Sequence, residues 1–279
     1  MTDQFIRERT YLKGVSPHTL LWYRDSFKAF QGATDSKAAI VQRIGELMER
    51  GVKPVSINTY LRCINAFLHW RDGHGEKCSP QCTHIHISRL KEEQKVLATF
   101  SQEQVKALLN FKPKGKNQAR AHIICSVLLD TGLRIAEALG IRHDAIDLDN
   151  MLMRVTGKGN KQRMVPISLE LRKLLFRWMQ RCPKEFVFGT HSGTMMTVRN
   201  FQRDFKAICV KLGITDVRCS PHTLRHTFAV SYLRAGGNLF YLSKILGHTS
   251  VKTTERYLQS LQIGDLQAVH DRLSLLSRR

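Results

Sequence analysis

The sequence predicts a mainly helical protein with a small β-sheet, organised as two domains. Apolar residues recur at helical spacing through most of the 279 residues. The runs 151–155 and 163–167 instead have the apolar pattern of two strands, joined by a glycine-containing turn. Residues 73–97 are polar and glycine-containing at first and then charged, which is typical of a linker. We therefore expect an all-helical domain over residues 1–90 and an α+β domain over residues 98–279.

The first domain should contain four short helices. Residues 5–30 favour helix but are interrupted near Gly14, after which Ser16 or Pro17 can start a second helix. A third helix fits residues 38–50, with Gly51 at its end, and a fourth fits residues 56–71. Helices of this length would bury their apolar sides against one another in a small bundle.

The second domain should begin near Thr99, where the following residues resemble the opening of a helix. Farther along, a Thr-Gly pair separates two apolar helices and places Arg134 at a helix start surrounded by core residues. A charge in that position needs a partner or a bound anion. The chain continues to an amphipathic helix that begins near Ile263.

The charge of the chain indicates a polyanionic partner. The formal net charge is +21 and the isoelectric point is about 10.1. Residues 1–90 carry 13 Lys and Arg against 8 Asp and Glu, and residues 91–279 carry 31 against 15, so most of the excess lies in the second domain. Binding to nucleic acid would then depend strongly on salt, because phosphate contacts release counterions.

No segment of the sequence reaches the length of apolar residues that a membrane span needs, and no basic region followed by an apolar run opens the chain. We expect a cytoplasmic protein with no membrane partner. The seven cysteines form an odd and scattered set, for which reduced thiols are the simplest interpretation.

One cluster in the linker has spacing close to that of a zinc site, and it comprises Cys78, Cys82, His84 and His86. The second pair follows too closely for a usual zinc finger or ribbon. A plain interdomain linker is therefore the favoured interpretation, and zinc binding is the alternative.

Basic and aromatic residues near the end of the chain match the needs of phosphodiester transfer. A phosphodiester gathers negative charge on its oxygens during transfer, and a guanidinium such as that of Arg225 offers a planar fork for two of them. His222 lies three residues earlier and would share its helix face. Gly247 should end one helix and Ser250 should cap the next, which would carry Tyr257. A phenol needs nearby cationic donors or a base to act as a nucleophile.

These residues resemble the tyrosine recombinase, or phage integrase, family, and specifically its compact Xer-type and integrase-like members. The matching motifs occur in order as Thr131-Gly132-Leu133-Arg134-Ile135-Ala136-Glu137, Gly157-Lys158-Gly159-Asn160-Lys161-Gln162-Arg163, His222-Thr223-Leu224-Arg225-His226, Leu246-Gly247-His248 and Tyr257. Each motif is short, but their combination in this order is specific.

The resemblance implies catalytic roles for six residues, which are Arg134, Lys158, His222, Arg225, His248 and Tyr257. The two arginines would bind the scissile phosphate, and Tyr257 would attack it to give a 3′-phosphotyrosyl link. Lys158 would protonate the departing 5′-oxygen. The two histidines would complete phosphate contact and proton handling, and Glu137 would steady the site. His226 is expected only to pack beside these residues, and no cofactor is implied.

The resemblance also implies how DNA is held. The first domain would be a SAM-like core-binding bundle that contacts duplex DNA through Lys53, Asn58 and Arg62, while Lys161 and Arg163 would touch the DNA backbone. The final helix would dock on a neighbouring protomer in a DNA-bound tetramer, or alternatively pack on its own domain. Accessory DNA-bending or excisionase proteins would set directionality.

The expected activity is site-specific exchange of DNA strands at paired sites. A type IB topoisomerase, which reseals the same strand, is the nearest alternative because its active site resembles this one. A catalytically silent DNA-binding regulator with the same fold is a second alternative, but the complete set of site residues disfavours it.

Overall fold

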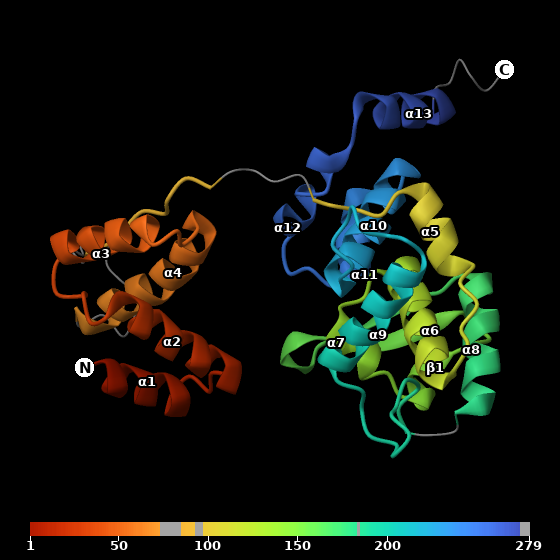
Figure 1. The fold of residues 1–279 in the computed structure, drawn as a ribbon, viewed down its shortest axis with the longest axis horizontal. Helices are drawn as coiled ribbons and strands as arrows, with labels where there is room; N and C mark the ends of the chain where they lie inside the picture. The colour runs from red at the N-terminus through yellow and green to blue at the C-terminus, as the bar shows by residue number, and fades with distance from the viewer. Residues whose placement is uncertain (73–84, 93–96, 183–184, 274–279) are drawn as a thin grey trace. The chain divides into compact units, whose positions relative to one another are not determined.

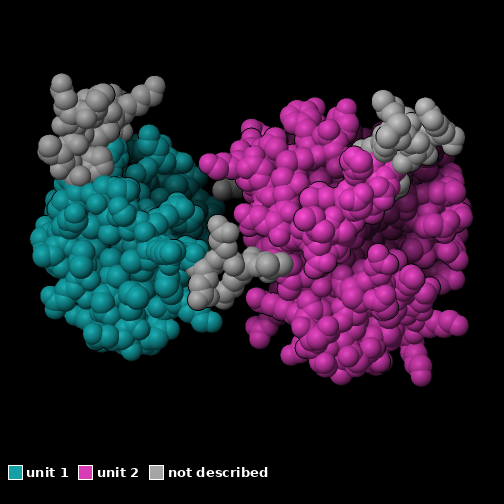
Figure 2. Space-filling model, turned by 90° about the horizontal axis from the view of Figure 1, so that it is seen from above, with its two compact units in different colours: residues 1–95 teal, residues 96–279 magenta. Residues whose placement is uncertain are grey.

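The computed structural model describes residues 1–72, 85–92, 97–182 and 185–273. The chain forms two compact units, residues 1–95 and residues 96–279, which Figure 2 shows in different colours. Helices dominate both units, and within the described residues the second unit holds a three-stranded sheet. This is the predicted fold class. Among the described residues, no helix is long and apolar enough to cross a membrane.

The first unit contains the four helices expected from the sequence: α1 (Thr2–Tyr11), α2 (Pro17–Phe30), α3 (Lys37–Glu49) and α4 (Pro54–Arg71). Ser16 and Ser36 cap α2 and α3 by accepting hydrogen bonds from backbone N–H groups of the first turns. Phe5 and Phe67 are buried between α1 and α4, with their ring centroids 5.6 Å apart in an edge-to-face arrangement. This aromatic core fixes the bundle.

Residues 85–92 lie within the predicted linker but pack against α4. The amide of Asn58 donates to the Leu90 carbonyl at 2.9 Å and accepts from the Leu90 N–H at 2.8 Å, and Asn65 makes the same pair of bonds with Ile87. Ile87 is buried in the core of the unit. The predicted linker of residues 73–97 was therefore too broad, because this stretch belongs to the first unit.

In the second unit, the helices surround α6 (Figure 1). The elements are α5 (Gln102–Leu109), α6 (Lys116–Thr131), α7 (Ile135–Leu139), η1 (His143–Ala145), β1 (Ile146–Asp147), β2 (Leu152–Thr156), η2 (Lys158–Asn160), β3 (Gln162–Pro166), α8 (Leu169–Arg181), α9 (Val198–Lys211), α10 (Pro221–Arg234), α11 (Leu239–Leu246), α12 (Lys252–Glu255), η3 (Leu258–Ser260) and α13 (Ile263–Leu273). The sheet is antiparallel in the order β1-β2-β3.

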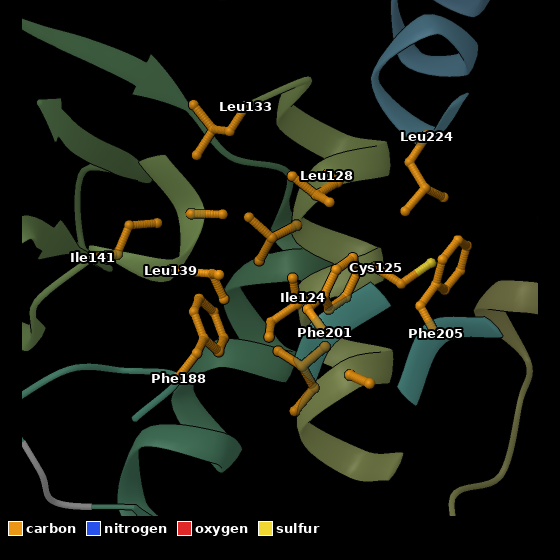
Figure 3. Close-up of a cluster of buried hydrophobic side chains, with 14 of the residues drawn as sticks. Ile124, Cys125, Leu128, Leu133, Leu139, Ile141, Phe188, Phe201, Phe205 and Leu224 are labelled. Atoms are coloured by element: carbon orange, nitrogen blue, oxygen red, sulfur yellow. The ribbon is translucent and has the colours of Figure 1, made fainter. Parts of the chain in front are cut away.

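The centre of the second unit is an apolar cluster around α6. Figure 3 shows Ile124, Cys125 and Leu128 of α6 facing Phe201 and Phe205 of α9 and Leu224 of α10. The two phenylalanine rings of α9 stack with their centroids 5.6 Å apart. Because α6 and α10 pack side by side, the turn that follows α6 is held next to the residues of α10. This packing brings together motifs that are far apart in the sequence.

Candidate active site

The turn between α6 and α7 presents Arg134 as predicted. Gly132 ends α6 with a φ of +63°, and a Cβ there would lie 2.2 Å from the ring of Phe228, so a larger residue cannot replace it without a shift. Arg134 follows as the N-cap of α7. Its backbone N–H donates to Glu137 at 2.9 Å, and its guanidinium donates to the same carboxylate at 3.0 Å.

Glu137 is the carboxylate on which two arginines converge. Its side chain is 6% exposed, and Arg163 makes a bidentate pair with it at 3.0 and 2.9 Å. Burial alone would raise the pKa of Glu137, but the hydrogen bonds from Arg163 and Arg134 outweigh burial and hold the pKa below its usual value. The carboxylate therefore stays ionised and fixes the orientation of Arg134.

Arg163 does not fit the predicted contact with the DNA backbone. Besides the pair with Glu137, its Nε donates to the Ile245 carbonyl at 2.9 Å, and its side chain is only 16% exposed. A Cβ at Gly247 would lie 2.8 Å from the Arg163 guanidinium, so the glycine leaves the space that this arginine fills. Arg163 ties β3 to α7 and to the end of α11. We correct its role to that of a positioning residue.

Arg225 lies at the centre of the site and is 5% exposed. Its guanidinium donates to the Gly132 carbonyl at 2.6 Å, to the Leu246 carbonyl at 2.9 Å and to His248 Nε2 at 3.0 Å. Burial, followed by the positive charge of Arg134, lowers the pKa of Arg225 to about 10, and Tyr257 and Glu137 oppose this shift. Arg225 remains a cation at neutral pH, buried beside a second cation, which favours an anionic ligand.

His248 is held in one tautomer by its two neighbours. Arg225 has no acceptor, so His248 Nε2 must accept its hydrogen bond, and the ring proton therefore lies on Nδ1. Nδ1 donates to the Thr254 hydroxyl at 2.8 Å. Burial and the nearby arginines, Arg225 first, lower the pKa of His248 to about 4. In the free protein at neutral pH the ring is neutral.

Tyr257 is 2% exposed and packs with apolar residues of α10 and α11. It lies between α12 and η3, not on a helix, and Val251 instead of the predicted Ser250 is the N-cap of α12. The phenol oxygen is 3.3 Å from Nδ1 of His226, and the two ring centroids are 5.6 Å apart. His226, expected to be a packing neighbour, thus contacts the predicted nucleophile. Its position one helical turn after His222 was the signal for this contact.

The remaining predicted residues occupy different settings. His222 is exposed on α10, with its ring centroid 6.4 Å from that of His226. Lys158 opens η2 in the hairpin, but its side chain lies outside the described part of the structure. Lys161 is exposed and lines a cavity of about 780 Å³ together with Arg134, Lys244 and His248. Lys244 was not singled out from the sequence. The cations that line this cavity give it a strongly basic wall.

Of the residues predicted to contact DNA from the first unit, Lys53 and Arg62 are exposed. Asn58 is 5% exposed and bonded to Leu90 and Glu92, so the predicted DNA contact is wrong for this residue. The hydrogen bonds of its side-chain amide hold residues 85–92 on α4.

The predicted zinc alternative falls mostly outside the described residues. Cys78, Cys82 and His84 are in the part of the chain that the structure does not describe, and His86 is exposed. Within the described ranges, no group of three or more metal-binding side chains comes together.

The folded protein should lose stability in mild acid, because His226 and His248 are neutral in the folded state. For His226 and His248 the folded pKa of about 4 lies below the ordinary value of 6.5, so stability is fully present above pH 6.5 and is lost as the pH falls toward 4. With allowance for solvent screening, each histidine should lower the free energy of unfolding by about 1 kcal/mol at pH 5. This loss corresponds to a melting temperature lower by roughly 2–4 °C. We expect thermal unfolding at pH 5 to occur several degrees below that at pH 7. A variant with asparagine at both positions should show a smaller difference, and an equal difference would contradict the assignment.

The model of the phage integrase family matches residues 98–262. The tyrosine recombinase XerD of Lacticaseibacillus casei is 32% identical over 217 residues, which cover 73% of this chain and 72% of that protein. The tyrosine recombinase XerC of Syntrophus aciditrophicus is 29% identical, over 82% of this chain and 77% of that protein.

Solved structures share the fold. The Tn1549 transposon integrase in complex with transposon right end DNA has a TM-score of 0.74 and 19% identity, over 98% of this chain and 99% of that chain. The XerH site-specific recombinase bound to its palindromic difH substrate has a TM-score of 0.73 and 17% identity, over 99% and 85% of the two chains. The matched family region spans more than half of the chain and contains all the pocket residues described above, and the chain therefore belongs to the phage integrase family of tyrosine recombinases.

Proposed function

We propose that this protein is a site-specific recombinase that cleaves and rejoins duplex DNA through a 3′-phosphotyrosyl intermediate. The observation that carries the proposal is the convergence of Arg134, Arg225, His248 and Tyr257 from four separate segments. Arg134 and Arg225 both donate to the Leu246 carbonyl, and Arg225 also bonds to His248 and interacts with Tyr257. Fixed guanidinium donors are suited to the charge that develops on phosphate oxygens during transfer.

The proposed reaction needs no external energy source. Tyr257 attacks the phosphorus, its Oη–P bond forms and the P–O5′ bond breaks, with Lys158 giving a proton to the departing 5′-oxygen. A 5′-hydroxyl of the partner strand then attacks the phosphotyrosine and releases Tyr257. Because one phosphodiester replaces another, the bond energy is retained and no cofactor is required.

The proposed partners are two duplex DNA sites held by a tetramer in the cytoplasm. Exposed Lys53 and Arg62 of the first unit and exposed Lys161 of the second are the candidate contacts to DNA phosphates. The tetramer would be linked by α13: this helix pairs Asp265 with Arg234 of its own α10, while Ile263 is 87% exposed and available to a neighbouring protomer. Accessory DNA-bending or excisionase proteins are proposed to set direction.

The decisive experiment separates recombination from its two alternatives. Bound duplexes are first selected from a random library, and the selected site is then placed twice on one supercoiled circle. A recombinase yields exchanged, protein-free products that require both sites. The intermediate, trapped on a nicked duplex, carries the DNA 3′ end on the peptide that contains Tyr257. Relaxation of a circle that carries no site would indicate a type IB topoisomerase. Binding without any covalent adduct would indicate a silent regulator.

Lys158→Ala is expected to slow cleavage in a way that depends on the leaving group. Loss of a general acid should reduce the cleavage rate of an ordinary duplex about 10²-fold, whereas a duplex with a 5′-sulfur leaving group should be cleaved at nearly the normal rate, because a thiolate needs little protonation. The control is Lys161→Ala in the same hairpin, which should not distinguish the two substrates. Equal slowing of both substrates by Lys158→Ala would remove the general-acid role.

A further inference from the structure

The side chain of His226 is built into the site beside the attacking oxygen. Its Nδ1 lies 3.3 Å from the Tyr257 phenol oxygen, and the tilted rings are 5.6 Å apart with an interplanar angle of 55°. His226 is half-buried on α10, and Tyr257 is 2% exposed. Backbone packing holds both partners, because α10 and η3 are in contact. The pair is therefore a feature of the folded core.

The surroundings determine the direction of this hydrogen bond. Arg225 and His222 on α10 and Arg256 next to Tyr257 face His226, and burial followed by these charges lowers its pKa to about 4. The imidazole is therefore neutral at pH 7 and has one nitrogen free to accept. The nearby Arg225 cation favours the lone pairs of the phenol oxygen on its own side, which leaves the O–H for His226, 3.3 Å away. In this arrangement Nδ1 is the acceptor and Nε2 carries the ring proton.

We propose that His226 is a further catalytic residue, the group that accepts the phenolic proton of Tyr257 during cleavage. As the Oη–P bond forms, the Oη–H bond breaks and the proton moves to Nδ1, giving an imidazolium. The P–O5′ bond breaks and the 5′-oxygen takes its proton from Lys158. On rejoining, His226 returns its proton to the departing Tyr257 oxygen. The negative charge of the bound phosphate offsets the cations that keep His226 neutral in the free protein, which makes the transfer easier in the complex.

This inference rests on the proposed function, and its test uses substitutions that separate proton transfer from positioning. In His226→Asn, the amide oxygen lies near the place of Nδ1 and can accept the hydrogen bond, but it cannot hold a proton. We expect single-turnover cleavage of a nicked suicide duplex to slow about 10²-fold in this variant. A 5′-sulfur leaving group should not restore the rate, since the missing group acts on the nucleophile. In Lys158→Ala the same substrate should restore it.

A more acidic nucleophile provides the second arm of the test. Fluorinated tyrosine at position 257 gives up its proton more readily. It should therefore raise the cleavage rate of His226→Asn at least tenfold. The matched control is His143→Asn, a half-buried histidine on η1, which should cleave at the rate of the unaltered protein. Melting temperature and DNA affinity are measured for each variant, and His226→Gln replaces His226→Asn if the latter unfolds.

The possible outcomes are distinct. Normal cleavage by His226→Asn, or a defect that fluorinated tyrosine leaves unchanged, would overturn the role of His226 and leave the recombinase proposal intact. Absence of any covalent product from the unaltered protein on its selected site would instead overturn the proposed function.

Discussion

Tyr257→Phe is expected to bind its DNA site with near-normal affinity and to form no covalent complex. The substitution removes a single oxygen, while the buried ring keeps its packing against α10 and α11. The lost hydrogen bond to His226 should cost about 1 kcal/mol of folding stability, which leaves the fold intact. Without the phenol oxygen there is no atom to become esterified. Affinity is measured by gel shift, and the covalent complex is measured on a nicked suicide duplex under denaturing conditions.

A matched control is Tyr241→Phe, because Tyr241 is also a tyrosine of the second unit but is 60% exposed on α11. This variant should form the covalent complex at the normal rate. Persistent covalent complex in Tyr257→Phe would mean that another residue is the nucleophile. Loss of binding together with cleavage would indicate that the phenol oxygen holds the site together instead of reacting.

The fold was predictable because its determinants are local. The third helix, expected over residues 38–50, spans Lys37–Glu49, since Ser36 can cap it and Gly51 follows its end. The hairpin expected over 151–155 and 163–167 differs from β2 and β3 by one residue at each boundary. The start of α7 at Arg134 followed from the Thr-Gly pair before it. Such signals lie within a few residues of the element they define.

The wrong predictions concern polar side chains whose partners are distant in sequence. Asn58 bonds to a backbone 32 residues away, and Arg163 bonds to a carboxylate 26 residues away. The predicted packing of His226 agrees with the structure, but its contact with a phenol 31 residues away was not foreseen. A basic or amide side chain on a helix or hairpin has the same local pattern whether it points to DNA or into the protein. Only the packing of α6 against α10 and of β3 against α11 decides between these possibilities.

Arg225→Lys tests whether the site depends on guanidinium geometry as well as on charge. A lysine keeps the positive charge but cannot reach the Gly132 and Leu246 carbonyls and a phosphate together. The turn after α6 and the end of α11 therefore lose the side chain that joins them. We expect cleavage to fall by at least about 10³-fold, because loss of one preorganised donor already costs about 10²–10³-fold. DNA affinity should change little, since the chain retains its net charge of +21.

Arg225→Ala should add a structural defect, because the Gly132 and Leu246 carbonyls would lose their buried donor at a cost of about 1–3 kcal/mol each. Its melting temperature should therefore fall below that of Arg225→Lys. The control is Arg177→Lys on the exposed face of α8, which should preserve both cleavage and stability. Cleavage by Arg225→Lys within tenfold of normal would show that a point charge suffices. In that case Arg225 would serve mainly to join α10 to the turns after α6 and α11, and the fork geometry would not explain catalysis.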